Sequence, residues 1–168
     1  MTVSVYVRSA CEIYTNFVPT PLAAIRAVLR ATALNQDGRT PGITQPSQVA
    51  QTANIRRAYG ENGLDLNDTG YFEAHGTGTV MGDLIEANAI YDAFQRPPSN
   101  PIHIGSLKAN IGHMEAVAGA GALIKSILVL EEGILPPNAY FEHVNPSIPE
   151  EKWGIKVRIY LRKRQSKC

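Results

Sequence analysis

The chain has 168 residues, of which 44% are hydrophobic and 18% are charged, and its formal net charge is +1. This composition supports a packed core and excludes wholesale disorder, and the length suits one compact domain. The balanced charge gives no general reason to expect nucleic acid or an anionic membrane as a partner. No apolar run reaches the ~20 residues that a transmembrane helix needs.

The two cysteines, Cys11 and Cys168, form neither a CxxC pair nor a disulfide framework. A reduced, cytoplasmic setting is therefore expected. The first residues show no basic stretch ahead of an apolar stretch, so no secretory signal is predicted.

In the first third of the chain, polar and apolar residues alternate in two places. Alternating valines over residues 3–7 predict a short strand. The alternation over residues 23–34 favours a second strand, although its alanines also suit a helix. Ser47 is the expected N-cap of a helix over residues 48–59, and Gly60 stands in the C-cap place.

A strand, a glycine-rich loop and a helix are predicted in the middle of the chain. The strand covers residues 71–74 and the loop covers residues 75–82. Asp83 and Glu86 have the spacing of a capping box, so we expect the helix to begin at Asp83 and to run to about residue 95.

The same order is repeated further along the chain. A strand is predicted over residues 102–104, a loop over residues 105–112 and a long helix over residues 113–132. Gly and Ala fill residues 118–122, so we expect this helix to approach another backbone closely and to be buried centrally. The alternation of strands and helices predicts an α/β fold.

Two of these strand-to-helix loops combine glycines with groups suited to acid–base or anion chemistry. The first has the sequence EAHGTGT and contains His75, Thr77 and Thr79. The second has the sequence GSLKANIGH and contains Lys108 and His113. Ligands of open α/β folds bind at the carboxyl ends of strands, where both loops are predicted to lie. Two imidazoles and an ammonium group suit a site where negative charge develops on an oxygen or an enolate.

Two other interpretations of these residues fit less well. Glycines at 76, 78 and 82 nearly match the dinucleotide fingerprint, but the spacing is off by one and no acidic residue ends the next strand. The four histidines, at 75, 103, 113 and 143, show neither HExxH nor an i,i+4 pair, so no metal site is predicted.

Four ordered motifs resemble those of β-ketoacyl synthases. They are EAHGTGT with the following GDLIEA, then GSLKANIGHMEAVAG, ATALNQDGRTPGITQPS and LPPNAYFEHVNPSI. The pattern is most similar to the ketosynthase domains of fungal type I polyketide synthases, whose reaction is the decarboxylative Claisen condensation of malonyl and acyl thioesters. The implied fold is the C-terminal half of the thiolase-like αβαβα sandwich, and therefore an incomplete α/β unit.

The resemblance implies a role for five side chains. His75 and His113 would bind the carbonyl of a malonyl thioester and stabilise the enolate formed on decarboxylation. Lys108 would tune the electrostatics of that site. Thr77 and Thr79 would contact the phosphopantetheine arm of an acyl carrier protein. No cofactor or metal bound by the chain itself is implied.

The sequence also departs from the family pattern. The DTACSS-type motif that carries the nucleophilic cysteine is absent, and Cys11 lacks the small-residue surroundings that would activate it. Leu84 replaces the usual proline, and a basic tail with five positive charges begins at Arg158. The tail is expected to be a solvated terminus rather than a nucleic-acid patch. Residues 1–157 thus contain 11 of the 16 basic residues and all 15 acidic residues.

We therefore expect an atypical segment over residues 1–20, a ketosynthase half over residues 21–157 and the basic tail over residues 158–168. Such a truncated ketosynthase-like chain would not condense thioesters alone. Its expected partners are an acyl carrier protein or a malonyl or acyl thioester. A full synthase, an N-terminal ketosynthase half or a second copy are further partners, since half a fold exposes an apolar face. The alternatives are a non-catalytic binding module and a pseudogene remnant.

Overall fold

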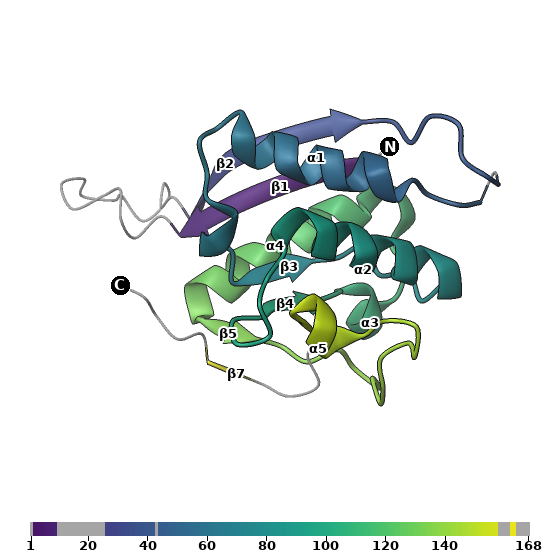
Figure 1. Ribbon diagram of the computed structural model, residues 1–168. Helices are drawn as coiled ribbons and strands as arrows, with labels where there is room; N and C mark the ends of the chain where they lie inside the picture. The colour runs from purple at the N-terminus through teal and green to yellow at the C-terminus, as the bar shows by residue number, and fades with distance from the viewer. Residues whose placement is uncertain (1, 10–25, 43, 158–161, 164–168) are drawn as a thin grey trace, which may run out of the picture.

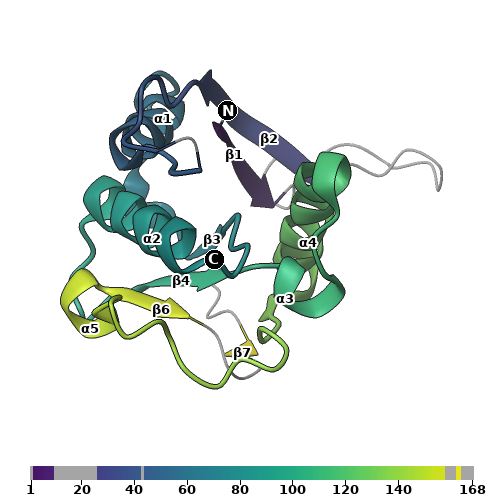
Figure 2. The same cartoon turned by 90° about the vertical axis from the view of Figure 1, so that its right-hand side faces the viewer.

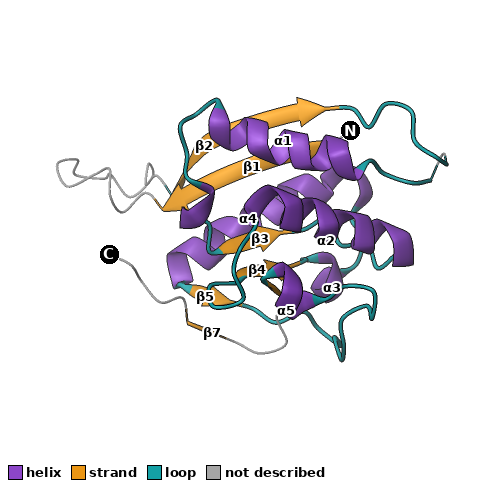
Figure 3. Cartoon of the chain, in the orientation of Figure 1, coloured by secondary structure: helices purple, strands orange, loops and turns teal. Residues whose placement is uncertain are grey.

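The computed structural model describes residues 2–9, 26–42, 44–157 and 162–163, and their strands lie between two groups of helices. On one side lie α1 (Gln48–Gly60) and α2 (Val80–Phe94), and on the other lies α4 (Ala118–Glu132). Figure 1 and Figure 2 show this arrangement from two directions, and Figure 3 shows β3 and β4 in the middle of the molecule, with α2 in front of them. The expected mixed α/β fold is confirmed.

The strands form three small sheets within the described residues. One is antiparallel and pairs β1 (Thr2–Ser9) with β2 (Ala27–Asn35). The second is parallel, in the order β3 (Tyr71–Glu73), β4 (Ile102–Gly105) and β6 (Ile155–Val157). The third pairs β5 (Ile134–Leu135) with β7 (Arg162–Lys163). The short helical turns are η2 (Leu66–Asp68), α3 (Lys108–Ile111), η3 (Glu115–Val117) and α5 (Glu150–Trp153).

The hydrophobic core fills the space between α1, α2 and the parallel sheet. Ile90 and Ile102 are the largest fully buried apolar side chains. The Phe94 ring meets the rings of Tyr59 and Phe72 edge-on, at centroid distances of 5.7 and 5.9 Å. Edge-to-face contact is the favoured geometry of aromatic pairs, so these rings tie the ends of α1 and α2 to β3.

The two strands predicted near the start of the chain are confirmed as β1 and β2, and residues 23–25 lie outside the described part. Ser47 is the N-cap of α1, since its Oγ accepts the N–H of Ala50 at 3.2 Å. The predicted C-cap was wrong by one residue, because Gly60 is still helical and Glu61 is the cap.

The predicted start of α2 was wrong, because the helix begins at Val80 with Thr79 as N-cap, three residues ahead of Asp83. Gly82 lies inside the helix, where a Cβ would stand 2.3 Å from Thr79 Oγ1. Asp83 and Glu86 do not form the expected capping box. Both carboxylates instead reach back to the loop before the helix, as described below.

The predicted long helix over residues 113–132 was also wrong in its first turn. Glu115, at φ 47°, interrupts it, and a 3-10 turn precedes α4. Its expected central burial was wrong for the described residues, since Ile124 is 59% exposed and Leu128 is 47% exposed. Gly121 allows a close approach, but its neighbours are the side chains of Met114 and Leu107 rather than another backbone.

Among the described residues, no helix is both long and apolar enough to cross a membrane.

Candidate functional site

The two histidine loops leave the parallel sheet at the same edge. β3 and β4 are paired so that Glu73 lies opposite Gly105, which places both loops at the carboxyl ends of their strands, as predicted. The rings of His75 and His113 lie perpendicular to each other, with their centroids 5.7 Å apart. Lys108 is the first residue of α3, between these two histidines in the chain. The structure therefore brings the expected histidines together.

The loop that carries His75 is held by acidic side chains of α2. The carboxylate of Glu86 accepts the N–H of His75 at 2.7 Å and the N–H of Gly76 at 2.9 Å. Asp83 accepts the N–H of Gly78 at 3.2 Å. Burial raises the pKa of Glu86, and its two backbone hydrogen bonds work against that rise. The carboxylates thus fix the backbone of the loop from which the His75 ring extends.

Gly76 occupies a position that a larger residue would not tolerate. Its φ is +45°, and a Cβ would stand 2.7 Å from the Cβ of Ser106. The first loop consequently lies directly against the start of the second loop. This glycine explains why the two loops can approach so closely.

Ser106 and Asn138 connect the second loop to its surroundings, and the sequence patterns did not single them out. The Asn138 side chain is buried, and its Oδ1 accepts the N–H of Ser106 at 3.1 Å. Ser106 Oγ lies 3.4 Å from the carbonyl oxygens of His75 and Gly76, and it accepts the N–H of Lys108 at 3.3 Å. A buried asparagine after two prolines, in the LPPN motif, was the available signal for this anchor.

A hydrogen bond from the local backbone determines the tautomer of the neutral His113 ring. Its Nδ1 accepts the N–H of Glu115 at 2.8 Å. In a neutral imidazole the proton then lies on Nε2, so this nitrogen is a hydrogen-bond donor. Gly112, at φ +79°, and Glu115, at φ 47°, make the sharp turn that allows this contact.

His75 has an electrostatic environment that favours its neutral form. Burial lowers the pKa of His75 below 6.5, and the positive charges of Lys108 and His113 lower it further. A neutral imidazole can donate a hydrogen bond without carrying charge.

The two threonines lie at the outer end of the first loop. Thr77 Oγ1 and Thr79 Oγ1 are 3.5 Å apart, and Thr79 is also the N-cap residue of α2. Thr79 is exposed and Thr77 is half-buried. Their hydroxyls are therefore on the same side of the loop.

Glu73 belongs to the EAHGTGT motif and was not expected to act in the site, yet its carboxylate contacts three other residues there. Its Oε2 lies 2.8 Å from the Nζ of Lys125, and both side chains are buried. Its Oε1 accepts the N–H of Leu107 at 2.5 Å. A carboxyl at the end of a buried strand was the only sequence signal, and nothing in the spacing pointed to Lys125.

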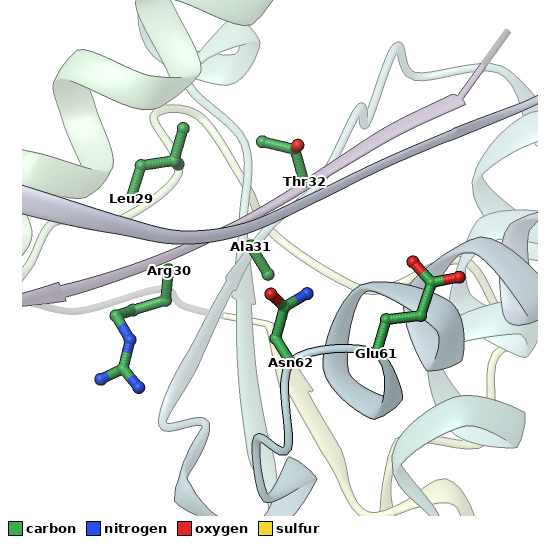
Figure 4. A pocket seen from close by; sticks show the side chains of 6 residues that line it. All are labelled: Leu29, Arg30, Ala31, Thr32, Glu61 and Asn62. Atoms are coloured by element: carbon green, nitrogen blue, oxygen red, sulfur yellow. The ribbon is translucent and has the colours of Figure 1, made fainter.

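Two hollows have linings that include neither His75 nor His113. A polar one of about 480 Å³ lies between β2 and the end of α1, lined by Leu29, Arg30, Ala31, Thr32, Glu61 and Asn62 (Figure 4). An apolar groove of about 580 Å³ follows α4, where Ile124 and Leu128 contribute to its lining. In the described part of the chain, no three His, Cys, Asp or Glu side chains are grouped as a metal site would require.

Comparison with known proteins identifies relatives of this arrangement. Residues 26–142 match the family described as the C-terminal domain of β-ketoacyl synthase. A partially reducing polyketide synthase from Menisporopsis theobromae is 54% identical over 79% of the chain, and a highly reducing one from Aspergillus calidoustus is 51% identical over 81%. The chain spans only 5% and 6% of the length of these two relatives.

Solved structures agree with this assignment. The oxazolomycin ketosynthase domain OzmH KS7 from Streptomyces albus has a TM-score of 0.80 at 36% identity, over 84% of this chain and 26% of its own. A ketosynthase from module 6 of the bacillaene synthase of Bacillus subtilis has a TM-score of 0.75 at 32% identity, over 85% of this chain and 28% of its own. Part of a thiolase-like ketosynthase fold is thus present, and the chain belongs to the β-ketoacyl synthase family, as a polyketide synthase ketosynthase C-terminal domain.

Proposed function

We propose that His75, Lys108 and His113 form the part of a ketosynthase site that decarboxylates a malonyl thioester. The observation that carries the proposal is the perpendicular contact of the two imidazoles at 5.7 Å, on loops fixed by Glu86 and Asn138. Two imidazoles this close together can donate hydrogen bonds to one small acceptor.

In the proposed step, the bond between the malonyl carboxylate and its α-carbon breaks, and carbon dioxide leaves. The electron pair of that bond moves into an enolate, whose oxygen was the thioester carbonyl. His113 Nε2 and the His75 ring donate hydrogen bonds to this oxygen as its negative charge develops. The positive charge of Lys108 favours the same charge development. The α-carbon of the enolate then takes a proton from water, which leaves hydroxide, and the product is an acetyl thioester.

Condensation requires a further group that this site does not supply in our proposal. An acyl chain must first be held on a nucleophile, which in the family is a cysteine. Cys11 and Cys168 both lie outside the family match over residues 26–142, and no DTACSS-type motif surrounds either of them. We therefore propose that this chain alone decarboxylates but does not condense.

The proposed thioester partner is an acyl carrier protein with a phosphopantetheine arm. Thr77 and Thr79 present neighbouring hydroxyls beside the histidines, where they would hydrogen-bond the amides of that arm. The relatives named above are polyketide synthases, which supports this class of substrate.

The experiment measures conversion of a malonyl-loaded carrier protein to the acetyl form by the purified chain. We expect His75→Ala and His113→Ala each to lower the rate about 10²–10³-fold, as for the loss of one oxyanion donor. His143→Ala is the matched control, because His143 is exposed and lies outside both loops. Equal rates in all three variants would contradict the proposal.

A second candidate function, as a binding module, is favoured by the outer face of α4. Ile124 and Leu128 are large apolar side chains with 59% and 47% exposure. The solved ketosynthases are about four times longer than the matched part, since the chain covers 26% and 28% of them. We propose that this face contacts an N-terminal ketosynthase half.

The test is binding of a purified N-terminal ketosynthase half, with the state of the chain alone measured by size-exclusion chromatography. Ile124→Lys combined with Leu128→Lys should abolish binding, whereas Val49→Lys, on a 78% exposed position of α1, should not. Self-association of the chain alone, lost in the same double variant, would assign the face to a second copy instead.

A further inference from the structure

We propose that the buried ion pair of Glu73 and Lys125 is the positioning element of the histidine cluster. It connects β3, the loop after β4, and α4. His75, Lys108 and His113 lie on or next to the chain segments that join these three. The inference builds on the proposed function, because it assigns a role to residues that hold that site. Its test needs no substrate, so the two can fail separately.

Both oxygens of the Glu73 carboxylate have partners, which lie on β3, in the loop after β4 and on α4. Its Oε2 lies 2.8 Å from Lys125 Nζ on α4 and accepts the hydroxyl of Tyr71 on β3. Its Oε1 accepts the N–H of Leu107 at 2.5 Å, in the loop after β4. The side chains of Glu73 and Lys125 are only 6% and 7% exposed. Because both side chains are buried, the loss of either one would leave the other as an uncompensated charge away from water.

Tyr71 completes the enclosure of this pair. The Lys125 ammonium lies 5.6 Å from the centre of the Tyr71 ring, within the range of a cation–π contact. Burial, together with the charge and hydrogen bond of Glu73, raises the pKa of Tyr71 far above its ordinary value, so it remains a donor. A Cβ at Gly105 would stand 2.6 Å from the Tyr71 hydroxyl, so this glycine leaves room for it.

The catalytic candidates are adjacent to these contacts in the chain. His75 follows Glu73 by two residues, and Lys108 directly follows Leu107. His113 precedes the 3-10 turn that leads into α4. A change in the position of Glu73 would therefore move both histidine loops relative to each other. A gain in stability is a weak explanation for a buried ion pair, because its replacement by apolar groups is often neutral or stabilising.

The main test is the double variant Glu73→Gln with Lys125→Met, which removes both charges and leaves an acceptor for the Leu107 N–H. We expect it to unfold near the wild-type midpoint, but to lose the nuclear Overhauser contact between the His75 and His113 rings. The single variant Lys125→Met should lose the same contact, and it also carries the cost of an uncompensated buried carboxylate. If it does not fold, the double variant still decides.

The matched control is Arg96→Met, at another buried cation far from the histidine loops. Arg96 is 5% exposed and donates to the carbonyl oxygens of Asn67 and Thr69 at 2.7 and 2.6 Å. Its loss should lower the unfolding midpoint and leave the contact between the histidine rings unchanged. A generally loosened fold would affect the ring contact in both variants.

The His75 titration, followed by histidine-labelled NMR on the full chain, gives a second readout. The groups that act on it are Lys108 and His113, with the Glu86 carboxylate at its peptide N–H. In the double variant we expect the pKa of His75 to rise toward 6.5 as these cations move away. A well-folded double variant that keeps the wild-type ring contact and titration would overturn the proposal.

Discussion

The apolar side chains on the two sides of the central strands are buried to very different degrees. On the side of α1 and α2, Ile55, Ala58 and Ile90 are at most 3% exposed. On the side of α4, Ile124 and Leu128 keep about half of their surface, at 59% and 47% exposure. One side is thus a finished core, whereas the other presents an apolar groove.

The histidine site draws on both sides. Glu86 of α2 holds the loop of His75 from the closed side, and Lys125 of α4 holds Glu73 from the open side. Loop geometry is therefore fixed by a few buried polar contacts, while stability depends chiefly on the packed core. Substitutions should separate these two contributions.

The largest effect is expected in the closed core. Ile90→Ala should lower the free energy of unfolding by about 2–5 kcal/mol, because it removes buried methyl groups and leaves a cavity. Leu128→Ala on the open side should change it by no more than about 0.5 kcal/mol. Urea unfolding of both variants measures the difference. Equal losses would show that the α4 side is as closed as the other.

A smaller effect is expected where the two loops touch. Gly76→Ala should cost about 1–3 kcal/mol, because the residue has a positive φ and its Cβ would press on Ser106. Gly78→Ala, also at positive φ but with open space around it, isolates the backbone contribution. Thermal unfolding of the two variants measures both losses of stability, and the difference between them is the cost of the contact with Ser106. Indistinguishable midpoints would mean that the loops are not tightly apposed.

The smallest effect concerns the charge on His75. Lys108→Met should raise the pKa of His75 toward 6.5 without reaching it, since burial is the larger cause of the lowering. An NMR titration of the His75 ring measures the change, and Lys152→Met on α5 is the control. No movement of the titration would place the Lys108 charge away from the ring.

The sign of the linked stability follows from the same shift. Folded His75 binds fewer protons than the unfolded chain between its lowered pKa and 6.5. The free energy of unfolding should therefore increase as the pH rises through that window and decrease as the pH falls through it. Lys108→Met should narrow the window, and urea unfolding at several pH values would show this.

Much of the fold could be predicted because local signals agreed. Valine alternation, the Ser47 cap and the apolar period of α2 each report a local preference, and β1 to β4 and α1 formed close to where they were expected. The short elements β5, β6, β7, α3 and α5 were not predicted, because their few residues carry no clear period. The errors occurred where long-range contacts decide. Glu86 looked like a capping residue but binds the preceding loop, and Glu115 adopts a positive φ inside an expected helix.

The candidate site was predictable only in part. His75, Lys108 and His113 could be named from two short motifs, whereas their supports come from distant parts of the chain. Lys125 follows Glu73 by 52 positions, and Asn138 follows Ser106 by 32. No periodicity links such residues, so only the folded structure brings them into one network.

Product analysis on a carrier protein tests the central claim most directly. The purified chain would be incubated with a malonyl-loaded carrier protein and an acyl thioester primer, and the carrier would be weighed by mass spectrometry. We expect the acetyl carrier, at a rate that depends on His75 and His113, and no β-ketoacyl carrier. An elongated carrier made by this chain alone, or no acetyl carrier above the rate of the histidine variants, would contradict the account.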